Sequence, residues 1–167
     1  MGGADRAAVA PVPFRPLLVV GRASCAGRAG VAGTGTWYDA VVVGGGPAGL
    51  SAALWLGRYR RRVCVFDAGR PRNAWARAVW GYPGVPGVPP GELRRRIREE
   101  AAALGVEFVA RAVVAAAPVA GGFRVEPAGG PPVAARRLVL AYGLRDSLPA
   151  LPGLESALGA SVFHCPD

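Results

Sequence analysis

The sequence contains no lysine, a single histidine and only three cysteines among its 167 residues. Three scattered cysteines with no complete C-x-x-C pair cannot build a disulfide framework, and one histidine leaves too few ligands for a structural zinc site. Long apolar runs are also missing, since none approaches the roughly 20 residues that a membrane-spanning helix needs. We therefore predict no metal site and no membrane span, and we expect a cytoplasmic location.

Positive charge is abundant, but arginine alone carries it. The chain has 20 basic and 11 acidic residues, which gives a formal net charge of +9. The arginine runs are short, and no aromatic residues are interleaved with them to stack on bases, as a single-strand binder requires. We expect no nucleic-acid partner. An arginine-driven nucleic-acid-binding protein stays as an alternative, which duplex binding with a steep salt dependence would support.

Composition divides the chain into three stretches. Residues 1–36 are rich in Arg, Gly and Pro, and we predict a disordered or non-core N-terminal extension there. Residues 37–146 carry the apolar patterns of one α/β domain, because the 51% hydrophobic share is high enough to bury a core. Residues 147–167 are punctuated by Pro and Gly and are interpreted as a connector.

The domain opens with a strand, a glycine turn, a helix and a second strand. Residues 38–43 form a short Val-rich run, residues 47–59 show helical spacing after a proline, and residues 62–66 form another apolar run. This βαβ pattern favours parallel pairing with a right-handed crossover. We therefore predict a Rossmann-like parallel sheet.

Further elements complete the predicted α/β fold. A Pro-rich loop over 69–91 precedes a helix over 91–104, whose apolar stripe is Leu93, Ile97 and Leu104. Residues 107–109 and 137–141 are expected to join the parallel sheet. A small antiparallel β-meander is predicted over residues 111–117, 122–126 and 133–135.

The strongest chemical signal is the segment Gly44-Gly45-Gly46-Pro47-Ala48-Gly49, which fits the dinucleotide-binding pattern G-x-G-x-x-G. In this pattern the first glycine permits a tight turn, the second lets the backbone approach a pyrophosphate, and the third lets the helix pack closely on the strand. Asp67 follows eighteen residues after Gly49, at the end of the next predicted strand, where an acid can accept hydrogen bonds from a ribose. The context therefore predicts a dinucleotide site.

From Tyr38 to Asp167 the chain resembles the amino-terminal part of the thioredoxin-reductase-like flavoproteins, which bind FAD and oxidise NAD(P)H. The resemblance lies in the following stretches, in the expected order: YDAVVVGGGPAGLSAALWLGR, VCVFDAGRPRN, WGYPGVPGVPPGEL, RRLVLAYGLRD, LPGLE and VFHCP. It implies an FAD-binding domain that is incomplete relative to the family.

The resemblance also implies which residues contact the cofactor. The glycine turn would hold the FAD pyrophosphate, and Asp67 the adenosine ribose. Arg72 and Asn73 match a segment that lies along the cofactor, and Val113 matches a backbone contact to adenine. The tripeptide Ala141-Tyr142-Gly143 matches the family's Ala-Thr-Gly turn beside the flavin, with Tyr142 in place of the usual Thr.

Two departures bear on activity. The family's redox pair is Cys-x-x-Cys, whereas only Cys165 is present here, so it is a candidate catalytic residue as a lone thiol at most. The sequence also has no second G-x-G-x-x-G for NAD(P)H, which the family places in a domain after the connector. The family transfers electrons from NAD(P)H through the flavin to a disulfide or another acceptor. We expect little turnover from this chain alone.

Other functions remain open at this point. The chain is interpreted either as truncated or as one half of a reductase, completed by a separately encoded C-terminal half or by a homodimer partner. A non-catalytic nucleotide-binding module is the main alternative. A small NAD-dependent dehydrogenase is disfavoured because the absence of lysine leaves no Tyr/Lys catalytic pair.

Overall fold

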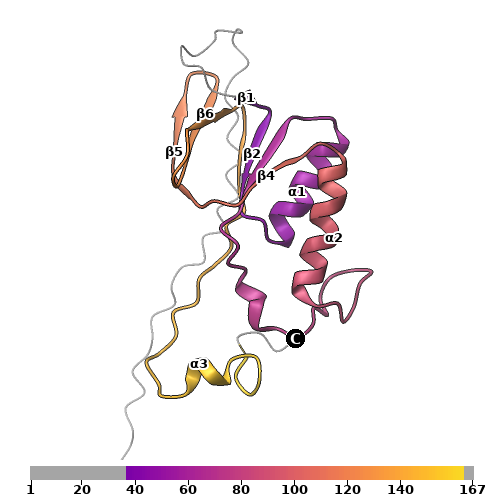
Figure 1. Ribbon diagram of the computed structural model, residues 1–167, viewed down its shortest axis with the longest axis vertical. Helices are drawn as coiled ribbons and strands as arrows, with labels where there is room; N and C mark the ends of the chain where they lie inside the picture. Colours follow the sequence, from indigo (N-terminus) through magenta and orange to yellow (C-terminus); the bar gives the residue numbers. More distant parts are fainter. Residues whose placement is uncertain (1–36, 164–167) are drawn as a thin grey trace, which may run out of the picture.

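The computed structural model describes residues 37–163, which form three layers. Helices α1 (Pro47–Arg58) and α2 (Pro90–Ala103) lie side by side on one face of a parallel sheet, and a second sheet covers the other face (Figure 1). The predicted α/β class with a parallel sheet and a small meander is therefore confirmed.

The parallel sheet has the strand order β4-β3-β2-β8. Its strands are β2 (Ala40–Val43), β3 (Val63–Phe66), β4 (Glu107–Val109) and β8 (Leu138–Leu140). The central strand β2 pairs on one side with β3 and on the other with β8, so that Val41 lies beside both Cys64 and Leu138. The carboxyl ends of all four strands consequently meet at one edge.

The second sheet contains the predicted meander and one further strand. Strands β5 (Val113–Val119), β6 (Gly122–Pro127) and β7 (Val133–Ala135) pair antiparallel in sequence order. Strand β1 (Trp37–Tyr38) adds to β7 in parallel. The single strand expected over 38–43 is therefore divided at Asp39, where the chain passes from one sheet to the other.

Strands β2, β3 and β8 of the parallel sheet lie between the two covering layers, which explains their unbroken apolar sequences, whereas the edge strand β4 begins with the exposed Glu107. Successive side chains alternate between faces. Val41 and Cys64 point to the meander, where they join a cluster with Tyr38, while Val42 and Val63 point to the helices. The site described below therefore rests on a well-packed layer.

Helix α2 begins at Pro90 and ends before Gly105, whose φ of +84° is the left-handed conformation typical of a helix stop. The expected stripe was wrong at its last position, because Leu104 is 39% exposed. Ala101 is fully buried instead, since the spacing of four that joins Leu93 to Ile97 continues to it.

Two segments leave the carboxyl edge of the parallel sheet together (Figure 1). One follows β3 and contains the short 3₁₀ helix η1 (Arg72–Trp75); the other follows β8 and contains the short helix α3 (Leu154–Ala157). The predicted loop before α2 is thus partly ordered, and a bridge between Val79 and Val88 closes it.

Some expectations are not tested by this structure. The extension over 1–36 and the thiol of Cys165 lie outside the described residues, and the domain boundaries stay predictions. Among residues 37–163, no helix has the length and apolar composition to cross a membrane.

Candidate functional site

The glycine turn lies between the carboxyl end of β2 and helix α1, and two of its glycines are required by close contacts. Gly44 has a φ of +107°, and a Cβ there would collide with the carbonyl oxygen of Ala141. A Cβ at Gly49 would collide with the carbonyl oxygen of Gly44. The helix therefore packs directly on the turn, as the roles predicted for these two glycines require.

Gly46 differs from both, because no described residue other than its chain neighbours has an atom within 4 Å of the position that its Cβ would take. The helix begins at Pro47, which has no N–H, and no side chain in the described part of the chain caps this end of α1. The first N–H groups of a helix lack partners within it and lie at the positive end of its dipole. The backbone N–H groups of Ala48 and Gly49 are therefore placed for an anion, with open space at Gly46.

Asp67 lies at the carboxyl end of β3, immediately beside the turn. Its backbone N–H donates to the carbonyl of Val109 at 3.0 Å, and its Oδ1 accepts the N–H of Gly69 at 3.0 Å. A Cβ at Gly45 would collide with the Asp67 carboxylate, so the turn and the acid touch. The structure thus brings Asp67 and the glycine turn together, as predicted.

Arg94 of α2 completes this contact, and the sequence reasoning missed it. Its Nη2 donates to Asp67 Oδ2 at 2.8 Å, and its Nε donates to the carbonyl oxygen of Gly45 at 3.1 Å. In the sequence, Arg94 stands in the short basic run 94–96. The available signal was its spacing of four from Arg98, which places both beside the buried stripe of Leu93 and Ile97.

A pocket of about 230 Å³ adjoins Asp67 between α1, α2 and β4. The residues that line it are Gly45, Leu50, Asp67, Gly91, Arg94, Arg95, Arg98 and Phe108. The guanidinium of Arg98 lies over the ring of Phe108, 4.6 Å from its centroid. The pocket therefore combines apolar walls with a strongly basic rim, which suits a ligand that carries both rings and phosphates.

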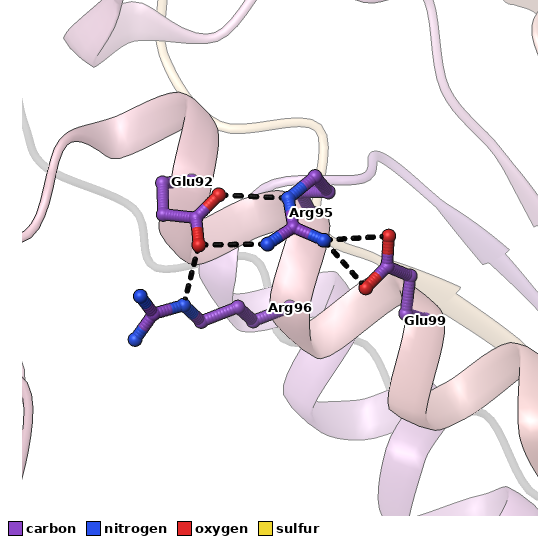
Figure 2. A network of polar contacts seen from close by, with 4 residues as sticks. All are labelled: Glu92, Arg95, Arg96 and Glu99. Atoms are coloured by element: carbon purple, nitrogen blue, oxygen red, sulfur yellow. Dashed lines mark hydrogen bonds and ion pairs between the residues drawn. The ribbon is translucent and has the colours of Figure 1, made fainter.

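An ion-pair network orders the start of α2 (Figure 2). Arg95 donates to both carboxylate oxygens of Glu92 at 2.7 Å and to Glu99 at 2.7 and 2.8 Å. Arg96 donates to Glu92 at 2.6 Å. The two arginines hold the pKa of Glu92 at about 2, below its usual value near 4.5.

Glu92 gives a pH dependence with a defined sign. A carboxylate whose pKa falls on folding stabilises the fold above its unfolded pKa, and that contribution is lost as the pH falls from about 4.5 towards 2. We expect Glu92→Gln to lower the thermal midpoint by a few degrees at pH 7 and by much less at pH 2, as measured by circular dichroism. Glu126→Gln, which alters an exposed pair in β6, is the control. An equal effect of Glu92→Gln at both pH values would contradict the expectation.

The tripeptide 141–143 lies beside the glycine turn, and its contact with the flavin stays a prediction. The backbone N–H of Ala141 donates to the carbonyl of Val43 at 2.8 Å, and the Ala141 carbonyl faces Gly44. Gly143 has a φ of +72°, and the Tyr142 side chain is 64% exposed. The end of β8 therefore forms one side of the turn.

Three further predicted residues lie apart from the turn. Arg72 and Asn73 are in η1, where the guanidinium of Arg72 donates hydrogen bonds to both carboxylate oxygens of Asp146 at 2.8–3.1 Å. This ion pair ties η1 to the segment after β8. Val113 begins β5 opposite Pro127 and packs against the core beneath the meander. Their cofactor contacts stay predictions.

One buried thiol is structural. Cys64 is fully buried in β3, and this burial, with a smaller effect from the charge of Glu107, raises its pKa to about 11. Tyr38 donates its hydroxyl hydrogen to Glu107 at 2.7 Å, and burial raises the pKa of this phenol. The thiolate is the reactive form of cysteine, so Cys64 is unsuited to nucleophilic or redox chemistry.

Comparison with known proteins gives a consistent result. Residues 38–167 match the family model described as pyridine nucleotide-disulphide oxidoreductase. A probable thioredoxin reductase from Arthroderma benhamiae is 35% identical over 136 residues, which cover 77% of this chain and 34% of the relative. A ferredoxin–NADP reductase from Rhodospirillum rubrum is 33% identical over 140 residues, or 75% of this chain and 41% of the relative.

A solved structure shows the same fold. The crystal structure of an oxidoreductase from Agrobacterium tumefaciens superposes with a TM-score of 0.73 at 40% identity, covering 78% of this chain and 45% of that one. The chain thus spans less than half the length of each of these three proteins.

Proposed function

The chain belongs to the pyridine nucleotide-disulphide oxidoreductase family, and we propose that it binds FAD through the ADP moiety of the cofactor. The observation that carries this proposal is the open space at Gly46 beside the uncapped start of α1. Asp67 stands next to this space as an acceptor for ribose hydroxyls. The proposed site therefore offers a separate partner to each polar part of an ADP group.

The residues present fit this group in shape and in charge. The two backbone N–H groups of Ala48 and Gly49 suit a pyrophosphate, and Arg98, which lies over Phe108 at the rim of the pocket, attracts an anionic ligand. The site is built on strand ends and a helix that pack tightly, so the ligand would meet a preformed surface. Such preorganisation reduces the entropy cost of binding.

The chemistry of the family comes from the flavin, which accepts a hydride from NAD(P)H and passes electrons to an acceptor. The proposed part of this chain is to bind and orient the cofactor. The segment that follows β8 touches the glycine turn at Ala141 and Tyr142, and we propose that this segment lies along the flavin half. We propose a disulfide or another electron acceptor as the substrate class.

We also propose that the nicotinamide site is supplied by residues other than those of the sequence given, for example in a C-terminal half of the reductase. Two observations support this proposal. The sequence has one G-x-G-x-x-G pattern, and the A. tumefaciens oxidoreductase is more than twice as long as the part that this chain matches.

A titration of the purified chain with FAD, ADP and FMN tests the proposal. Calorimetry at about 0.15 M salt limits non-specific attraction to the basic surface. We expect FAD and ADP to bind and FMN, which lacks the ADP group, to bind at least about 10-fold more weakly. A chain that binds neither FAD nor ADP would refute the proposed function.

The same sample separates the reductase from its main alternative, a non-catalytic nucleotide-binding module. NAD(P)H is added to the FAD-loaded chain, with and without a disulfide acceptor, and the loss of reduced nicotinamide is followed. Oxidation of NAD(P)H would support the reductase function. FAD binding without oxidation of NAD(P)H, even with a candidate partner chain present, would favour a non-catalytic nucleotide-binding module.

A further inference from the structure

Arg94 joins the two halves of the proposed nucleotide site. It lies near the start of α2 and reaches Asp67 Oδ2 with Nη2 and the Gly45 carbonyl with Nε, at 2.8 and 3.1 Å. Its side chain is 22% exposed, and that of Asp67 is 16% exposed. This partly buried pair differs from the other arginine pairs of α2, whose side chains are more exposed.

The contact with Arg94 orients the Asp67 carboxylate and leaves both of its oxygens able to accept a further hydrogen bond. Among residues 37–163, each carboxylate oxygen has one donor, which is Gly69 N–H for Oδ1 and Arg94 for Oδ2. A carboxylate can accept about four hydrogen bonds, two on each oxygen. One acceptor position therefore remains on each oxygen, which matches the two vicinal hydroxyls of a ribose.

Arg94 also offsets an unfavourable charge. The Asp67 carboxylate touches the turn that is proposed to bind a pyrophosphate, so its negative charge opposes that ligand. The guanidinium cancels this charge locally without removing the acceptor oxygens. Its planar fork reaches the acid and the turn together, which the single ammonium of a lysine cannot do in the same way.

We propose that Arg94 is a positioning residue that sets ribose selectivity, by holding the Asp67 carboxylate against the glycine turn in the orientation that accepts two vicinal hydroxyls. This inference rests on the proposed function. It assigns to α2 a part in nucleotide recognition beyond the strand–turn–helix motif.

The test compares ADP with 2′-deoxy-ADP in calorimetric titrations of the full chain. We expect the unsubstituted chain to prefer ADP by roughly 10-fold or more, the size of a hydrogen bond to a charged group. Arg94→Met should weaken both nucleotides, because the Asp67 charge is no longer offset beside the pyrophosphate, but it should weaken ADP about 10-fold more than 2′-deoxy-ADP, so the preference falls towards 1. Arg94→Lys should recover part of the lost affinity at low salt but not the preference.

Two controls separate positioning from folding. Arg96→Met removes an arginine from the same helix, where it contacts Glu92 away from the pocket, and should leave the preference intact. In an Asp67→Asn background, Arg94→Met should have no further effect on the preference, because the residue acts through that carboxylate.

The outcomes are distinguishable. If the unsubstituted chain binds ADP and Arg94→Met keeps the full preference, the role of Arg94 is refuted and the proposed function stands. If the unsubstituted chain binds neither nucleotide, both are refuted. A preference that collapses in Arg94→Met but not in Arg96→Met supports the inference.

Discussion

Gly46→Asp is expected to abolish nucleotide binding while the fold keeps its stability. The new side chain meets open space, and the backbone at Gly46, with φ of −76° and ψ of 176°, suits any residue. Asp is a favourable residue at the start of a helix, so the free energy of unfolding should stay within a few tenths of a kcal/mol or rise. The carboxylate would occupy the N–H groups proposed for the phosphates and repel the ligand.

The expected loss of ADP affinity is about 100-fold or more, measured by calorimetry beside urea unfolding of the same sample. Gly81→Asp is the matched control, since it also places a carboxylate in open space, in the loop before α2. Unchanged ADP binding by the Gly46 variant would mean that phosphates do not bind at this turn.

Gly49→Val is expected to destabilise the chain strongly. The new Cβ would collide with the carbonyl oxygen of Gly44 and lie 3.2 Å from Val42 Cγ1. The obstacle is backbone, so relief requires α1 to move away from the sheet and lose packing against it. We expect the free energy of unfolding to fall by about 3 kcal/mol or more, a large part of the stability of a typical domain.

The measurement is a urea titration in which the midpoint falls and the slope stays the same. Ala48→Val is the control, because it introduces the same side chain one residue earlier at an exposed position and should cost less than about 1 kcal/mol. Equal midpoints for the two variants would contradict the direct contact between helix and turn. Together with Gly46→Asp, this pair separates the structural glycine from the ligand-facing one.

The motif and most of the elements could be predicted from the sequence because their signals are local. The Val-rich strands, the proline that begins α1, and Gly105 at the end of α2 each act within a few residues, whereas α2 begins at Pro90, one residue before the predicted start. The three-layer arrangement follows from them, since strands without polar residues must be covered on both faces. The glycine turn was predictable for the same reason.

Contacts between distant parts of the chain could not be predicted in this way. Asp39 divides the first strand because its N–H donates a hydrogen bond to the carbonyl of Arg62 and its carboxylate accepts one from the N–H of Arg62. No local sequence pattern predicts this pair of contacts. Arg94 reaches Asp67 across 27 positions, and its spacing of four from Arg98 places it beside the buried stripe of α2 without indicating which acid it contacts. Only the packing of α2 against α1 decides which arginine faces the site.

Strand order has a consequence for the chain as it is synthesised. Strand β2 is the first strand of the parallel sheet to leave the ribosome, yet its second neighbour, β8, is the last. At ordinary synthesis rates the interval between them is on the order of ten seconds. Throughout that time one edge of a Val-rich strand has unpaired backbone groups that could pair with another nascent chain. This edge of β2 is paired only after Leu138–Leu140 have been synthesised and have formed β8. The same pairing places Ala141 against the glycine turn, so the sheet and the proposed nucleotide site are completed in one step.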